Sequence, residues 1–355
     1  MCRDYATESA QIIDLSKYFV LPGLIDAHVH LFLRTYQFYD WDMQVIQENP
    51  FERTLRAGQF AAKTLQAGFT SVRDLGTEGA GDADLALKNS INSGDIIGPR
   101  LFISSRAIVS TGGYPPKGYN AEFYGGEVAD GVEEMRKVVR RQLNIGGADW
   151  IKLYGDYSRY QGRTFPLFTQ EEIEAAVSEA AEVNAQVAVH AKDPEAIKRA
   201  VRAGAKSIEH ASGADDEALL EIKSAGVALV PTLAISEAIA LYNPDDAARQ
   251  ASFERSKQMF RRALELGVPI VCGSDAGGLP NGENARELEL MVENGMSTTY
   301  ALQTATSLAG QLLQGTSSPT IGVLTPGAFA DIVAVEGNPL QVSPYYYQGF
   351  LPFFL

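Results

Sequence analysis

The residues best suited to chemistry in this chain are its histidines. The 355 residues contain four, His28, His30, His190 and His210. Each stands at the end of a short apolar, β-branched run that is typical of a strand. His28 and His30 are two positions apart, so on an extended strand their side chains share one side. Neutral imidazole is the commonest protein ligand for zinc and similar metals, so convergence of the four would make a metal site.

Two further polar residues occupy comparable positions. Asp275 follows another apolar run in CGSDAGG, where a carboxylate can bind a metal and take a proton from water, although this segment is also ordinary turn chemistry. Lys152 lies in DWIKLY between Ile151 and Leu153 and therefore points away from both. Such a lysine is either a buried amine with a lowered pKa or one whose stem is buried and whose tip reaches water.

Eight strand-like runs position these residues: Leu24–His28, Thr70–Asp74, Leu101–Ser105, Trp150–Tyr154, Val187–His190, Ser207–His210, Ala228–Pro231 and Pro269–Gly273. Helical patterns lie between them, among them 53–66, 132–143, 170–183, 194–203, 215–225 and 251–266. This alternation predicts a parallel sheet, and eight repeats over roughly 250 residues match a closed (β/α)8 TIM barrel. A doubly wound open sheet is the alternative, but no GxGxxG loop follows the first run.

A barrel would explain the placement of the polar residues. The carboxyl ends of barrel strands meet at one mouth, where the active sites of such enzymes lie. Histidines that are far apart in the sequence would then face the same small space, together with Asp275. This common placement favours a metal site over unrelated core histidines.

The two ends of the chain lie outside the predicted barrel, which spans residues 21–315. Residues 1–20 contain a strand-like run at Gln11–Leu15, and residues 316–355 contain apolar runs at 322–324 and 330–335. We expect these ends to pair as a small accessory β-layer. The chain finishes on YYYQGFLPFFL, which either packs on the body, lies in an interface of a homo-oligomer or is a free tail.

Composition limits the class of protein. The net charge of −14 and the pI of about 4.8 disfavour nucleic acid as a partner. No uninterrupted apolar run approaches the roughly 18 to 20 residues of a membrane span, and the first residues do not resemble a signal peptide. The two cysteines, Cys2 and Cys272, do not predict a disulfide framework. We therefore expect a cytoplasmic protein.

Several segments together resemble the amidohydrolase superfamily. LPGLIDAHVHLF at 21–32 is similar to its first-strand motif, and the resemblance continues in segments that cover most of the chain: GFTSVRDLG, IKLY, VAVHA, SIEHA, GSDAGG, ALQTATSLAGQLL and IGVLTPGAFADIVAVEGNPL. The imidazolonepropionase-like and Xaa-Pro dipeptidase-like subgroup is the most similar. Members usually carry longer ends that build an accessory β-sandwich, so the resemblance implies a truncated sandwich here.

The resemblance implies two divalent metal ions, expected to be zinc. It assigns one metal to His28 and His30, the other to His190 and His210, a carbamylated Lys152 as the bridge between them, and Asp275 as ligand and proton shuttle. It further implies a small-molecule substrate and hydrolysis of its amide C–N bond, in a dipeptide such as Xaa-Pro or in an N-acyl amino acid, by a hydroxide shared between the metals. A deaminase, a lactonase or an inactive truncated protein remains an alternative. Lys152 counts against a deaminase, since those relatives generally use one metal.

Three residues are candidates for substrate contacts. Tyr154 faces the same side as Lys152, and Tyr114 lies in STGGYPPKGY, where many relatives carry a histidine. Each hydroxyl is a candidate oxyanion donor, or else each ring is a rim aromatic. Arg73 could bind a substrate carboxylate or form a structural ion pair with Asp74 or another acid.

Overall fold

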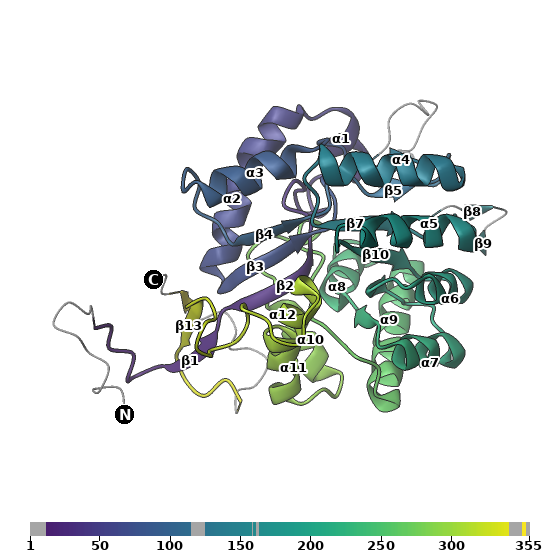
Figure 1. The fold of residues 1–355 in the computed structure, drawn as a ribbon. Helices are drawn as coiled ribbons and strands as arrows, with labels where there is room; N and C mark the ends of the chain where they lie inside the picture. Colours follow the sequence, from purple (N-terminus) through teal and green to yellow (C-terminus); the bar gives the residue numbers. More distant parts are fainter. Residues whose placement is uncertain (1–11, 115–124, 158, 161–162, 341–349, 353–355) are drawn as a thin grey trace.

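The computed structural model describes residues 12–114, 125–157, 159–160, 163–340 and 350–352. Its parallel strands form two sheets. The three-stranded sheet has the order β2-β3-β4 and the six-stranded sheet the order β12-β11-β10-β7-β5-β6 (Figure 1). Their bounds are β2 Leu24–Val29, β3 Phe69–Asp74, β4 Arg100–Ile103, β5 Ile108–Val109, β6 Glu127–Val128, β7 Trp150–Tyr154, β10 Gln186–Ala191, β11 Ser207–His210 and β12 Ala228–Val230. A short antiparallel pair, β8 Arg159–Tyr160 and β9 Arg163–Thr164, stands apart.

Helices alternate with these strands along the chain and cover the outer side of the sheets (Figure 1). Their bounds are α1 Trp41–Ile46, α2 Pro50–Gln66, α3 Ala83–Asn92, α4 Gly131–Asn144, α5 Gln170–Ala181, α6 Pro194–Ala203, α7 Asp216–Ala225, α8 Leu233–Tyr242, α9 Ala247–Leu266, α10 Arg286–Glu293, α11 Thr298–Thr304 and α12 Ser307–Gln314. Aspartates cap several of them. The side chain of Asp193, for example, accepts from the backbone N–H groups of Glu195 and Ala196, which satisfies donors that a helix start leaves open. The predicted α/β alternation is thus confirmed.

The eighth predicted strand is not formed as a strand. Pro269–Gly273 makes an isolated parallel bridge, Leu229 with Ile270, and belongs to neither sheet. Backbone hydrogen bonds nevertheless tie this segment to strands on both sides. Leu229 N donates to Pro269 O at 2.8 Å, and Ala27 N donates to Cys272 O at 2.9 Å. Among the described residues, therefore, the strands do not make one closed sheet by their assigned ladders.

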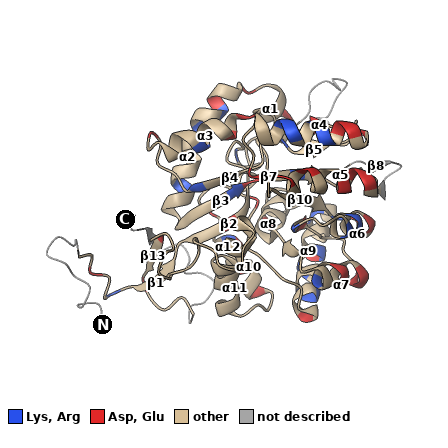
Figure 2. Ribbon diagram, in the orientation of Figure 1, with Lys and Arg blue, Asp and Glu red and all other residues tan. Residues whose placement is uncertain are grey.

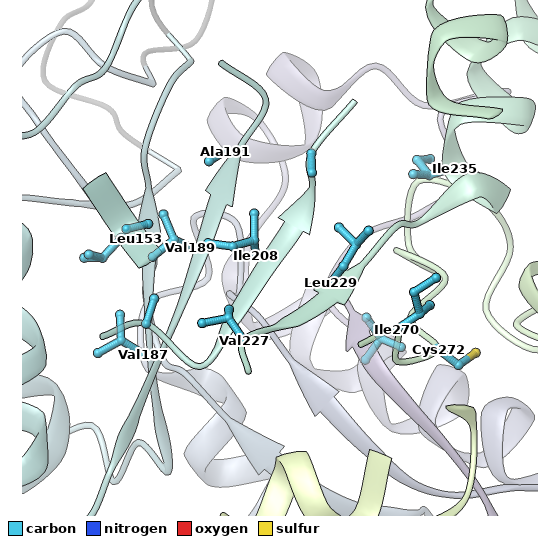
Figure 3. Close-up of a cluster of buried hydrophobic side chains, with 14 of the residues drawn as sticks. Leu153, Val187, Val189, Ala191, Ile208, Val227, Leu229, Ile235, Ile270 and Cys272 are labelled. Atoms are coloured by element: carbon cyan, nitrogen blue, oxygen red, sulfur yellow. The ribbon is translucent and has the colours of Figure 1, made fainter. Parts of the chain in front are cut away.

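The main apolar core lies between the parallel strands and the outer helices. Figure 3 shows part of it, where Leu153 of β7, Val189 of β10, Ile208 of β11 and Leu229 of β12 come from neighbouring strands. These side chains are completely buried. Because neighbouring residues on a strand point to opposite faces, filling this face with aliphatic groups leaves the alternate residues of the same strands facing inward.

The two ends of the chain pair with each other, as predicted, but with different residues. β1 Phe19–Pro22 runs antiparallel to β13 Ile332–Val335, which also pairs with β14 Phe350–Pro352. Residues 12–15 are not in a strand, so the prediction at Gln11–Leu15 is wrong for its described part, and Gln11 itself lies outside the described residues. The result is one three-stranded sheet, and a second sandwich layer is not seen in the described part of the chain.

Charged residues of both signs lie mainly on the outer helices (Figure 2). Several pair between neighbouring helices, such as Arg140 of α4 with Glu179 of α5 and Arg202 of α6 with Glu221 of α7. Exposed pairs of this kind contribute little to stability. In the part of the chain that the structure describes, none of the helices combines the length and the apolar character that crossing a bilayer would require.

Candidate active site

A cavity of about 630 Å³ opens at the carboxyl ends of the parallel strands. All four histidines reach it, as do Lys152, Asp275, Tyr114 and Tyr154. Its remaining lining comes from Tyr36, Glu78, Tyr157, Lys192, Ser212, Ile235, Ser236, Ile239, Asp246, Ala248, Arg249, Ser252, Arg255 and Ser256. The side chains that the sequence predicts as metal ligands therefore line one cavity, although they come from segments up to 247 residues apart in the chain.

Strand alternation explains how most of these side chains reach the cavity. In β7, Ile151 and Leu153 belong to the core under the helices, so Lys152 and Tyr154 point inward. His210 is an exception, because Ile208 of the same strand faces the helices and strict alternation would send His210 there too. Its backbone has φ 70°, a left-handed conformation that is uncommon for residues other than glycine. This local turn redirects the imidazole to the cavity.

The imidazole rings lie close together. The ring centroid of His28 is 5.3 Å from that of His30 and 5.2 Å from that of His210, and His210 is 4.5 Å from His190. Asp275 places its Oδ1 3.4 Å from His30 Nε2 and 3.7 Å from His28 Nε2. Ligand atoms of His28, His210 and Asp275 all lie within 4.8 Å of one another. That spacing suits ligands that converge on a metal centre.

Each of three histidines has a partner that orients its ring through Nδ1. His28 contacts Glu209 Oε2 at 2.7 Å, His30 contacts the backbone oxygen of Gly76 at 2.8 Å, and His210 contacts Thr232 Oγ1 at 2.6 Å. These contacts leave Nε2 of each ring for the cavity. Metal-binding histidines typically use their second nitrogen in this way. Sequence reasoning missed Glu209 and Thr232, although both lie within or just after predicted strands.

Arg73 does not line the cavity. It is completely buried, donates to Glu209 Oε1 at 3.0 Å and to Ala27 O at 2.7 Å, and stacks over Trp150 at 4.2 Å. The substrate-carboxylate interpretation of Arg73 is therefore wrong for this structure, and the structural ion pair is correct with Glu209 as the acid. The reason is its position within β3, below the mouth. Arg73 compensates the charge of Glu209, which in turn orients His28.

Several buried polar atoms at the site have no hydrogen-bond partner among the described residues. They include Lys152 Nζ and both ring nitrogens of His190. Buried polar atoms are rarely left without a partner in folded proteins, and here they belong to the positions that the resemblance assigns to metal binding. This donor set fits a divalent metal centre.

The electrostatics of the site also suit metal ligands. Burial lowers the pKa values of His28, His190 and His210 well below the usual range, which keeps the rings neutral and able to coordinate. Burial lowers the pKa of Lys152 to about 8. Burial raises the pKa of Asp275 to about 6, although His30 and Lys152 oppose the rise. Both values lie close to neutrality, where a proton can be held or released.

A buried carboxylate that sequence reasoning missed completes the site. Glu78 is 2% exposed and accepts hydrogen bonds from Tyr154 Oη, from Tyr114 Oη at 3.1 Å and from Trp41 Nε1 at 2.7 Å. It lies in the loop after β3, in GTEG, where the sequence alone indicates only a turn. Both tyrosines thus reach the cavity as predicted, with their hydroxyl protons directed at Glu78.

Comparison with known proteins agrees with this geometry. Residues 19–350 match the model of the amidohydrolase family, and the chain belongs to that family. It is therefore a hydrolase that acts on amide C–N bonds.

Individual relatives share most of the chain. An ochratoxinase from Aspergillus niger is 33% identical over 350 residues, which cover 91% of this chain and 71% of that protein. A solved Xaa-Pro dipeptidase with bound methionine superposes with a TM-score of 0.87 at 33% identity, covering 97% of this chain and 87% of the other. A solved prolidase complexed with N-methylphosphonate-L-proline gives a TM-score of 0.83 at 29% identity, with 95% and 84% covered.

Proposed function

We propose that this protein is a binuclear metal-dependent hydrolase that cleaves the amide bond of a small molecule, a dipeptide of the Xaa-Pro kind or an N-acyl amino acid. The observation that carries the proposal is the convergence of four histidines, Lys152 and Asp275 on one cavity. The similarity to a dipeptidase, a prolidase and an ochratoxinase supports it.

We propose that His28 and His30 hold one divalent ion with Asp275, that His190 and His210 hold the other, and that Lys152 bridges them as a carbamate. Zinc suits imidazole and carboxylate ligands. The lowered pKa of Lys152, about 8, leaves a fraction of its amine unprotonated near neutrality, the form that reacts with carbon dioxide. As a carbamate the side chain becomes an anion, so its burial among cations is favourable rather than costly.

The remaining chemistry belongs to Asp275. Divalent ions at such a site act as Lewis acids that lower the pKa of water and polarise a carbonyl oxygen. The Asp275 carboxylate accepts the proton that the attacking water loses and delivers it to the leaving amine, which is acid–base catalysis by one group in two steps. Its raised pKa of about 6 matches this task, because a catalytic acid–base group works best near the operating pH.

We also propose that the two parallel sheets are parts of one closed (β/α)8 barrel, at whose mouth the cavity lies. The hydrogen bonds of segment 269–276 to β12 and β2 support closure on one side. The bond from Asp149 N to Ile103 O, at 2.8 Å, supports it between β4 and β7. We assign the barrel to residues 21–315 and the accessory β-segments to residues 1–20 and 316–355.

Metal content per chain tests the proposal. Protein purified with bicarbonate and added zinc should contain about two metal ions per chain, and Lys152→Ala should lose most of this metal. Lys192→Ala is the matched control, because Lys192 lines the same cavity but is not among the proposed ligands. A folded wild-type protein without metal would refute the binuclear site and favour an inactive member of the family. Metal-loaded protein is then assayed on dipeptides and N-acyl amino acids, with lactones and amino-purines as the competing classes.

A further inference from the structure

One wall of the cavity consists of aromatic side chains around the buried carboxylate of Glu78. Tyr36, Tyr114, Tyr154 and Tyr157 line the cavity beside it. The ring of Tyr114 lies 4.5 Å from that of Tyr154 and 4.4 Å from that of Tyr157. No catalytic step proposed above uses this cluster, which we call the Glu78 wall.

The hydrogen bonds of the Glu78 wall have a defined direction. An indole N–H can only donate, so Trp41 fixes Glu78 Oε2 as an acceptor. Tyr114 donates to the same oxygen and Tyr154 donates to Oε1. A hydroxyl carries one proton, so neither tyrosine has a donor left for the cavity. Glu78 and these two tyrosines therefore offer acceptor oxygens and electron-rich ring faces to a ligand, which argues against the oxyanion-donor role for either tyrosine.

We propose that the Glu78 wall is a subsite for the protonated amino group of the substrate. An ammonium group has three donors and no acceptor, is attracted to aromatic faces, and is neutralised by a buried carboxylate. This inference rests on the proposed amide hydrolysis and narrows its substrates. It selects dipeptides with a free N-terminus over N-acyl amino acids, whose acyl group has no cation to place there.

The position of the wall agrees with this assignment. Glu78 Oε1 lies 4.0 Å from His30 Nδ1, so the wall adjoins the proposed metal ligands. In a dipeptide the amino nitrogen is two bonds from the scissile carbonyl carbon. A subsite for the amino group must therefore lie next to the metal ligands that hold this carbonyl. Of the other cationic side chains in the cavity, Lys192 after β10 lies 5.8 Å from the centre of the Tyr157 ring, whereas Arg249 and Arg255 lie on α9, where Arg249 pairs with Asp246. Arg255, on a helix that contributes no residue to the wall, supplies a positive charge for the carboxylate of a zwitterionic substrate.

Matched pairs of ligands test the subsite. We expect metal-loaded protein to hydrolyse Xaa-Pro dipeptides with a kcat/KM at least about tenfold above that of their N-acetyl forms, since a hydrogen-bonded charge contributes about 10- to 100-fold. Glu78→Gln should remove this preference by slowing the free dipeptides alone. Glu133→Gln, an equal change of charge at an exposed position of α4, should keep it.

Binding measured without turnover separates this inference from the proposed reaction. By calorimetry, alanine amide should bind at least about tenfold more tightly than N-acetylalanine amide, and Glu78→Gln should abolish the difference. Amine-selective binding without hydrolysis would overturn the reaction and keep the subsite. Hydrolysis with equal rates for both members of each pair, or equal binding of the two amides, would overturn the subsite. If Glu78→Gln does not fold, Glu78→Asp, which keeps the charge but shortens the side chain by one methylene, should reduce the preference several-fold.

Discussion

Arg73 and Glu209 form a buried ion pair beneath the cavity, and Glu209 orients the ring of His28. Removing the charge of Arg73 tests how much this pair contributes to the stability of the fold. Arg73→Met keeps most of the side-chain volume but removes the charge and the donors to Glu209, Ser207 and Ala27. Both members of the pair are completely buried. Glu209 would then remain as an uncompensated buried charge, which typically costs about 3 to 5 kcal/mol. For 355 residues this corresponds to a Tm about 5 °C lower.

The assay is thermal unfolding of metal-free protein, so that changes in metal binding do not contribute. The matched control is Arg140→Met, which removes an ion pair with Glu179 of similar geometry, but at a position where the arginine is 61% exposed. An exposed pair contributes at most about 1 kcal/mol, so Tm should change little. In the double variant Arg73→Met/Glu209→Gln, part of the lost stability should return because the buried charge is gone. Equal effects of Arg73→Met and Arg140→Met would refute the reasoning.

Three further outcomes follow from the structure. Burial raises the pKa of Glu287 to about 8, above its unfolded value, so the contribution of this carboxyl to stability is present at low pH and is lost as pH rises through about 8. The Tm of Glu287→Gln, measured relative to that of wild type, should therefore increase between about pH 5 and pH 9. A Tm difference that stays constant over this range would contradict the prediction. Thr232→Val removes the hydroxyl that contacts the His210 ring and should weaken metal binding about 10- to 100-fold in a chelator competition, whereas Thr232→Ser should not. Gly277→Ala would place a Cβ 2.4 Å from a backbone oxygen and should lower Tm more than Gly295→Ala, where a Cβ meets nothing within 4 Å; similar Tm losses would show that the loop relaxes.

The sequence predicted the regular elements because their signals are local. Seven of the eight strand-like runs correspond to strands in the structure, since apolar periodicity and turn residues act within a few positions of each other. The run at 269–273 did not form a ladder, because its neighbours approach it only through single bridges and isolated hydrogen bonds. The strand at Gln11–Leu15 was misplaced for a related reason. Segment 19–22 becomes a strand because it pairs with β13. That partner lies more than 300 residues away in the sequence, so the residues around 19–22 do not predict the pairing.

The candidate ligands could also be proposed from the sequence. Histidine is rare in this chain, each instance ends a strand-like run, and the topology of parallel strands brings such ends together. That reasoning needs residue types and element order, and no side-chain detail.

Only the tertiary structure decided how those residues are supported. Whether Arg73 meets substrate or a buried acid depends on which side chain of another strand lies opposite it, and the structure places Glu209 there. The inward turn of His210 depends on a left-handed backbone conformation that strand periodicity does not predict. Glu78 is recognised as part of the site only because donors on three separate segments meet its carboxylate. Residue types and local periodicity are properties of the chain, whereas burial, partners and hydrogen-bond direction arise only when distant segments pack together.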